Sequence, residues 1–312
     1  MAGSPLLGRV RNRAERLRQR RWRMAAYRSA EHHIVMGGAP RSGTTLLRKL
    51  LDRHPQICAG AETKLFVPAA FNLAWLAEAY AIPRTELEAM RRAAASQGSF
   101  IDAFAGRTRA EAGKARWAEK TPQNIRHLDW ILDRFPGASV IHVLRDGRDV
   151  VCSMREHPDW RWVDGAWQKV LVPRPLAWYA QRWMEDTAAG MARRSDGRFM
   201  EVRYEDLVSD PVVALRSICA SLGVAADAAW LDEVGGTARG EGRGMASGGE
   251  PGALGTATVL DRGKGRHSAR PDYEGVVTAV SVGRWQRDLS APEQQEVERL
   301  CGARLRELGY ES

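Results

Sequence analysis

The chain has 312 residues, 44% of them hydrophobic, and a formal net charge of +9 at pH 7. This composition is typical of a globular protein with a substantial core. Residues 1–30 contain nine arginines against one acid, Glu15, so residues 31–312 carry a net charge of only +1. The positive charge belongs to a tail, which argues against nucleic acid as a partner of the larger part of the chain.

The first predicted element is this arginine-rich N-terminal tail, residues 1–30. It has no apolar run long enough for a signal peptide or a membrane span, and Arg20-Arg21 lacks the hydrophobic region of a twin-arginine export signal. We favour a solvated amphipathic helix, and contact of the basic tail with a membrane surface or a partner is the alternative. We predict one larger domain over residues 31–312.

The segment from Ile34 to Leu47, IVMGGAPRSGTTLL, predicts a phosphate-binding loop. A short strand runs into Gly37-Gly38 and a helix opens at Thr44, so backbone N–H groups and a helix N-terminus can hold phosphate oxygens. The P-loop pattern G-x-x-x-x-G-K-[ST] has a lysine where Thr44 stands, and that lysine reaches the β- and γ-phosphates in kinases and nucleotide hydrolases. We therefore expect a nucleotide with a different 5′ end.

The rest of the chain predicts alternating helices and strands. Pro55 ends the helix after the loop, Pro83 divides the helices expected over residues 65–95, and a further break is expected near Gly98 and Gly106. The later predicted elements are an extended piece 117–121, a helix 122–135, a buried strand 138–144, a helix 174–194, a strand 199–202 and helices 210–222 and 291–308.

Residues 235–270 interrupt this alternation with eleven glycines and few large apolar side chains, so we predict a mobile insertion there. Outside the insertion, the alternation predicts an α/β fold, a P-loop-like doubly wound parallel sheet flanked by helices. Ligands of such sheets bind at the carboxyl ends of the strands.

The segment from Val140 to Met154, VIHVLRDGRDVVCSM, predicts a second anion site. A buried strand ends at Arg145 and a helix bears Ser153, so guanidinium and hydroxyl can converge on one anion, such as a 3′-phosphate on adenosine. Two alternatives use the same segment. Arg145 and Asp146 can form a capped turn with a surface ion pair, or Asp146 can be the metal ligand of a kinase, although a cation at the strand end opposes a magnesium site.

Together these segments resemble the sulfotransferases that use 3′-phosphoadenylyl sulfate (PAPS), and most of all their tyrosylprotein-sulfotransferase-like branch. The resemblance runs from about Ile34 to the C-terminus, without residues 235–265. It implies that the 5′-phosphosulfate is bound by Arg41, Ser42, Gly43, Thr44 and Thr45, and the 3′-phosphate by Arg145 and Ser153. It also implies that Tyr204 in VRYEDL lies near the nucleotide, and that Arg284, where the family has lysine, approaches the 3′-phosphate.

The same resemblance implies the catalytic residues. Glu62 in GAETKLF matches the glutamate that takes the proton of the acceptor hydroxyl. Lys120 in AEKTP matches the lysine that stabilises charge on the departing bridging oxygen, with Arg41 as a second electrostatic stabiliser. Without the resemblance, Glu62 is equally typical of a first helical turn and Lys120 of a protein surface.

Some positions depart from the family pattern. The arginine expected twelve residues after Arg145 is His157, and the transition-state serine has only Ser268 as a loose candidate. We see no counterpart of the branch's membrane anchor. The tryptophans at 160, 162 and 167 are core residues in the simplest interpretation, and walls for an aromatic or sugar acceptor in the alternative.

The function that we expect is transfer of a sulfuryl group from PAPS to a hydroxyl acceptor, a small molecule or peptide bearing a phenol, tyrosine, sugar or lipid hydroxyl. A sulfuryl group carries fewer charges than a γ-phosphoryl group, so we expect no metal. A metal-dependent kinase and a non-catalytic nucleotide-binding or membrane adaptor are the alternatives. The scattered cysteines 58, 152, 219 and 301 predict buried free thiols in a reducing compartment, and thus a cytoplasmic protein.

Overall fold

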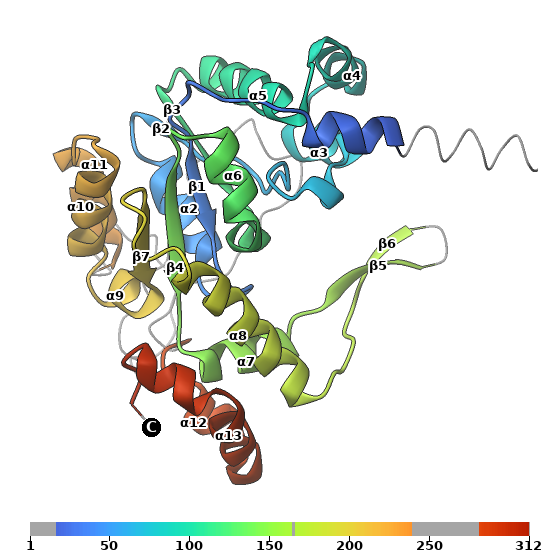
Figure 1. Cartoon of the computed structure of the whole chain (residues 1–312). Coiled ribbons are helices and arrows are strands. Elements are labelled where there is room, and N and C mark those ends of the chain that lie inside the picture. The colour runs from blue at the N-terminus through green and yellow to red at the C-terminus, as the bar shows by residue number, and fades with distance from the viewer. Residues whose placement is uncertain (1–16, 164–165, 239–280, 312) are drawn as a thin grey trace, which may run out of the picture.

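A five-stranded sheet forms the centre of the molecule (Figure 1). The computed structural model describes residues 17–163, 166–238 and 281–311. The strand order is β2-β3-β1-β4-β7, and all neighbouring strands pair in parallel, which confirms the predicted fold class. The strands are β1 (Ile34–Gly37), β2 (Ile57–Cys58), β3 (Arg116–Lys120), β4 (Ser139–Leu144) and β7 (Phe199–Arg203).

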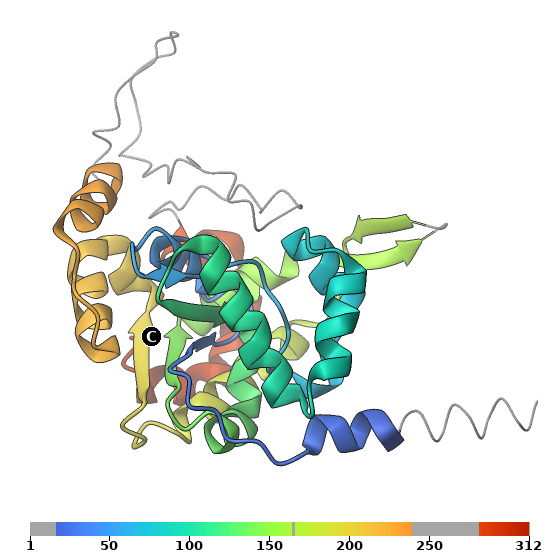
Figure 2. The same cartoon turned by 90° about the horizontal axis from the view of Figure 1, so that it is seen from above.

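Helices cover both faces of this sheet (Figures 1 and 2). Side chains alternate along β1, so Val35 joins one core cluster with Phe100 while Ile34 and Met36 join another with Leu47. The helices are α2 (Thr44–Asp52), α3 (Leu73–Tyr80), α4 (Arg84–Ala93), α5 (Gln97–Ala112), α6 (Leu128–Arg134), α7 (Gly147–Arg155), α8 (Leu176–Met191), α9 (Tyr204–Ser209), α10 (Pro211–Leu222), α11 (Ala228–Ala238), α12 (Trp285–Asp288) and α13 (Ala291–Glu307).

The structure confirms the predicted break near Gly98, since α4 ends at Ala93 and α5 begins at Gln97, but the break near Gly106 is wrong because that glycine lies inside α5. Ser96 starts the helix with a capping box, in which its side chain accepts from the backbone N–H of Ser99 at 3.0 Å. A close contact explains the first glycine. A Cβ on Gly98 would lie 2.4 Å from Cδ1 of Tyr27, so this glycine lets the ring approach the helix instead of ending it.

Three other boundaries differ from the prediction. The expected helix 122–135 begins as a 3-10 helix, Pro122–His127, and becomes α-helical only in α6. The tryptophan-rich segment forms an antiparallel hairpin, β5 (Asp159–Val163) and β6 (Ala166–Val170), which projects from the body of the molecule (Figures 1 and 2). Helix α11 extends to Ala238, so residues 235–238 are helical, and the rest of the predicted insertion lies outside the described residues.

The described end of the arginine-rich tail contains a helix, residues 17–24, beside α3 and α4 (Figure 1). Trp22 of this helix joins the same core cluster as α5, and the division at residue 31 stays a prediction. Across the described part of the chain, no helix is long and apolar enough to cross a membrane. The four cysteines are free and buried, as expected, and burial raises the pKa of the Cys58 thiol to about 11.

Candidate active site

The loop between β1 and α2 has an unusual backbone at three positions, with φ of 150° at Gly38, 72° at Arg41 and 95° at Gly43. A Cβ on Gly38 would lie 2.4 Å from the carbonyl oxygen of Val143, and one on Gly43 would lie 2.4 Å from the Tyr204 ring, so only glycine fits at either place. Helix α2 starts directly after Gly43, with no side-chain cap among the described residues and no acid in its first turn. Its first N–H groups therefore suit an anion.

Arg41 connects this loop to the second predicted anion site. Its Nε donates to Oγ of Ser153 at 3.1 Å, and its backbone carbonyl accepts from Nη1 of Arg145 at 3.0 Å. The structure thus brings Arg41, Arg145 and Ser153 together at the carboxyl ends of β1 and β4, whereas the sequence predicted only that Arg145 and Ser153 converge.

Arg145 is buried among polar and aromatic groups. The residue is 5% exposed, its Cζ is 4.4 Å from the centre of the Tyr204 ring, and Nη2 donates to the carbonyl of Ser281 at 2.5 Å. Its Nε, in contrast, has no hydrogen-bond partner among the described residues. Because a buried, charged N–H without a partner is costly, this position suits an anion that accepts from Arg145.

Asp149 of α7 holds residues 281–285 beside Arg145. Its buried carboxylate accepts from the backbone N–H groups of Gly283 at 2.9 Å and Trp285 at 3.1 Å, and burial raises the pKa of Asp149. The side chain of Arg284, for which we predicted a phosphate contact, instead donates to Glu156 at 2.6 Å and Asp288 at 2.5 Å. The segment therefore approaches Arg145 through its backbone, while the guanidinium of Arg284 contacts two carboxylates.

Glu62 and Lys120, the two predicted catalytic residues, form an ion pair with 3.1 Å between Oε2 and Nζ. Lys120 is the last residue of β3 and pairs in register with Met36 of β1, just before the phosphate-binding loop. The loop is linked to the same segment by the N–H of Gly38, which donates to the carbonyl of Pro122 at 3.0 Å. The side chain of Glu62 is 27% exposed and that of Lys120 only 8%, so the carboxylate is the part open to a ligand.

Glu119, which we did not predict from the sequence, holds both catalytic segments. Glu119 is 1% exposed, and its Oε1 accepts from the N–H of Thr63 at 3.1 Å, from the Thr63 hydroxyl at 2.7 Å and from the Thr121 hydroxyl at 2.6 Å. Oε2 accepts from Asn124, which also donates to the carbonyl of Met36 at 3.1 Å. Burial raises the pKa of Glu119 against the opposing effect of these hydrogen bonds. The sequence signal for Glu119 was a charged residue inside the short extended segment 117–121, because a carboxylate buried in a strand needs hydrogen-bond donors around it.

Three more side chains fix the backbone around Glu62. The indole N–H of Trp75 donates to the carbonyl of Glu62 at 2.8 Å, and the hydroxyl of Tyr80 donates to the preceding carbonyl at 2.6 Å. Gln97 donates to the carbonyl of Leu65 at 2.7 Å. The position of the Glu62 backbone is therefore set by side chains from α3 and α5, as expected of a preorganised site.

Asp146 and His157 complete the surroundings of the anion site. Asp146 caps α7 by accepting from the N–H of Arg148 at 2.9 Å, and its carboxylate also accepts from the Arg148 guanidinium at 2.8 Å. This carboxylate is thus engaged in a capped turn, which weakens the interpretation of Asp146 as a metal ligand. Burial lowers the pKa of His157, and the positive charge of Arg41 lowers it further. Ser268 lies outside the described residues.

The model of the sulfotransferase family matches residues 33–228, which is well over half of the chain. The chain belongs to the sulfotransferase family. The matched region contains the loop, Glu62, Lys120, Arg145, Ser153 and Tyr204, whereas Arg284 lies beyond it.

Individual members of the sulfotransferase family that cover about two thirds of this chain share less than a third of the aligned residues with it. Protein-tyrosine sulfotransferase from Drosophila melanogaster is 29% identical over 228 residues, which cover 68% of this chain. The chain spans 41% of the length of that relative.

Solved sulfotransferase structures share the fold. The sulfotransferase domain of the Synechococcus PCC 7002 olefin synthase has a TM-score of 0.56 at 20% identity and covers 90% of this chain and 97% of that domain. Mouse sulfotransferase SULT7A1, solved in complex with PAP, has a TM-score of 0.55 at 15% identity and covers 90% of this chain and 86% of its own. At these identities the likeness supports the fold alone.

Proposed function

We propose that this member of the sulfotransferase family transfers a sulfuryl group from PAPS to a hydroxyl acceptor. The observation that carries the proposal is the Glu62–Lys120 ion pair. It lies at the carboxyl ends of the parallel strands, as does the lysine-free phosphate loop. A partly exposed carboxylate beside a buried cation supports a general base next to an electrostatic stabiliser.

The residues present fit the donor at both of its ends. The 5′ end would be held by residues 41–45 and by the N-terminus of α2, which has no side-chain cap among the described residues. The 3′-phosphate would be held by Arg145 and Ser153, and the Nε of Arg145, which has no partner among the described residues, supports this role. Arg284 would contribute through the segment that contacts Arg145, because its own guanidinium contacts Glu156 and Asp288.

When bound, PAPS supplies an activated sulfuryl group on a phosphate leaving group. The Glu62 carboxylate takes the proton of the acceptor hydroxyl as that oxygen forms its bond to sulfur. Lys120 and Arg41 stabilise the negative charge that develops on the bridging oxygen as the sulfur–oxygen bond breaks. The proton ends on Glu62 and the electron pair on the departing phosphate oxygen, so the step balances as an in-line displacement without a metal.

The acceptor belongs to the hydroxyl class, and the likeness to a protein-tyrosine sulfotransferase makes a tyrosine-containing peptide the first candidate. Phenols, sugars and lipid hydroxyls are further candidates, because a carboxylate base can take the proton of each of these hydroxyls. The four free buried cysteines support a reducing compartment, and we propose a cytoplasmic location.

The proposal is tested with purified protein, PAPS labelled with radioactive sulfur, and a panel of peptide, phenol, sugar and lipid acceptors. Sulfate and phosphate add nearly the same mass, so the label identifies the transferred group. Label in one acceptor class supports the proposal. Transfer from labelled ATP in magnesium, with none from PAPS, would identify a kinase, and tight PAP binding without any transfer would identify a non-catalytic adaptor.

A further inference from the structure

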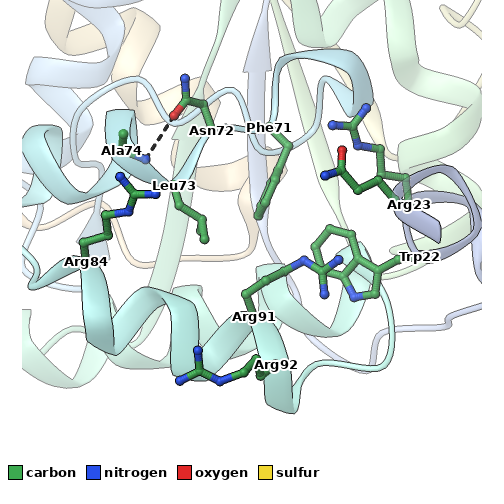
Figure 3. A pocket seen from close by; sticks show the side chains of 10 residues that line it. Trp22, Arg23, Phe71, Asn72, Leu73, Ala74, Arg84, Arg91 and Arg92 are labelled. Atoms are coloured by element: carbon green, nitrogen blue, oxygen red, sulfur yellow. Dashed lines mark hydrogen bonds between the residues drawn. The ribbon is translucent and has the colours of Figure 1, made fainter. Parts of the chain in front are cut away.

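A pocket of about 470 Å³ lies between the N-terminal helix 17–24, the start of α3 and the helix α4 (Figure 3). None of the candidate active-site residues contributes to its walls. The residues that line it are Gln19, Trp22, Arg23, Phe71, Asn72, Leu73, Ala74, Arg84, Arg91 and Arg92.

Aromatic rings form the apolar part of this pocket. Trp22 and Phe71 meet edge to face with 5.2 Å between their ring centres. The indole N–H of Trp22 donates to the carbonyl of Ala94 at 2.9 Å, which fixes the ring against the end of α4. The guanidinium of Arg91 lies over the same ring (Figure 3), with its Cζ 3.4 Å from the ring centre.

The polar part of the pocket carries one sign of charge. Four arginines line it and no acidic side chain does, so its electrostatic complement is an anion. Arg84 also pairs with Glu88 at 2.9 Å on the exposed face of α4. The pocket thus combines several guanidinium donors with aromatic surface, a combination that suits an anionic group attached to an apolar body.

The N-terminal helix exposes apolar side chains next to this pocket. Leu17 and Met24 are each 53% exposed, and they are seven residues apart, so they share a helical face. Between them the helix carries Arg18, Arg20, Arg21 and Arg23. A basic helix with exposed apolar residues is the pattern of a segment that lies in a membrane interface.

This surface is held in place by the residues that follow the helix. The hydroxyls of Tyr27 and Ser29 both donate to Oδ2 of Asp102 on α5, at 2.5 and 2.6 Å. Asp102 also contacts Nε2 of His33 at 2.7 Å. Burial raises the pKa of Tyr27, and the Asp102 carboxylate raises it further, so the phenol stays a donor. The helix that forms one wall of the pocket is therefore docked on the domain.

We infer that the pocket binds the phosphodiester headgroup of an anionic lipid, with Leu17 and Met24 entering the membrane interface beside it. The phosphate oxygens accept from the arginines of the pocket, and the apolar part of the headgroup region contacts Trp22 and Phe71. The exposed apolar pair favours a membrane over an acidic protein surface, because an acidic protein would need only the arginines.

The test is flotation of the full chain with vesicles of phosphatidylcholine alone or with phosphatidylglycerol, at about 0.15 M salt. The pocket variant is Arg23→Glu with Arg92→Glu. The matched control is Arg216→Glu with Arg299→Glu, which makes the same charge change at exposed positions on α10 and α13. Unchanged circular dichroism checks the fold, and Arg23→Gln with Arg92→Gln provides a milder second variant.

We expect binding to the phosphatidylglycerol vesicles, at least about tenfold weaker partitioning for the pocket variant and little change for the control. The glutamine variant should lie between wild type and the glutamate variant. Equal losses of vesicle binding in the pocket variant and the control would show that the net charge of the chain alone determines binding. Vesicle binding as strong as wild type by the pocket variant would assign the contact to other arginines. Binding of polyglutamate but not of vesicles would point to an acidic protein instead, and stabilisation by glycerol phosphate without vesicle binding would point to a small ligand. Any of these four results overturns the inference.

Discussion

Nζ of Lys120 lies 3.1 Å from Oε2 of Glu62, although the two residues are 58 positions apart and belong to different segments. The lysine comes from the buried end of β3 and the glutamate from a loop fixed by side chains of α3 and α5. In the resting site each charge compensates the other, so removing one partner leaves the other without its counter-ion.

Replacing Lys120 should slow catalysis more than it weakens nucleotide binding. Lys120→Ala removes the cation beside the departing oxygen, and we expect kcat to fall by about 10²-fold or more with a much smaller change in the Kd for PAP. Lys49→Ala on α2 removes the same charge away from the ion pair and serves as the control. A kcat within twofold of wild type for Lys120→Ala would show that the lysine is structural.

Glu119→Gln should slow catalysis only by disturbing the positions of the segments that carry Glu62 and Lys120. One amide oxygen can still accept from Thr63 and Thr121, but the new NH₂ group faces the NH₂ of Asn124, donor against donor. We expect about 1–3 kcal/mol less stability and roughly tenfold lower kcat, with the KM for PAPS nearly unchanged. Glu296→Gln on α13 makes the same chemical change elsewhere. A raised KM for PAPS with an unchanged kcat would contradict this role.

Arg145 should determine which nucleotide binds. Adenosine 3′,5′-bisphosphate should raise Tm far more than AMP or ATP, because only it offers a 3′-phosphate to Arg145 and Ser153. Arg145→Ala should cost about 2–4 kcal/mol of bisphosphate binding by calorimetry, while AMP binding changes little. Equal binding of bisphosphate and AMP by the wild type would show that Arg145 and Ser153 do not form a 3′-phosphate site.

Acid should weaken one turn that leads into β7. Arg198 holds Asp196 through two contacts at 2.9 and 2.7 Å, and this lowers the pKa of Asp196 to about 2. A depressed pKa gives stability that is present above the unfolded value and lost as the pH falls through the folded one. Because both side chains are partly exposed to solvent, Asp196→Asn should lower Tm at pH 6 by only about 1–2 °C. That difference should shrink between about pH 4 and pH 2, and a difference that grows instead would contradict the assignment.

The sequence predicted β1, β3, β4 and β7, because β1 and most of β4 are apolar runs that end at the two anion-binding segments, but it did not predict β2 or the β5–β6 hairpin. Gly106 misled, because α5 continues through it and is held against the core by buried neighbours such as Phe104. Local spacing predicted that Arg145 and Ser153 lie close together, but it did not predict that Arg41 contacts both. It could not reveal the donors around Glu119, or the pairing of Arg284 with Glu156, because those partners meet only in the folded chain.

The central claim is that Glu62 is the general base, and turnover of Glu62→Gln with labelled PAPS tests it most directly. The amide keeps the shape of the side chain but cannot take the proton, so kcat should fall by roughly 10²–10⁴-fold. The Kd for adenosine 3′,5′-bisphosphate should stay within about twofold, because the predicted nucleotide contacts come from other residues. Full activity of Glu62→Gln, on an acceptor hydroxyl of high pKa, would contradict the account and assign the base to another residue.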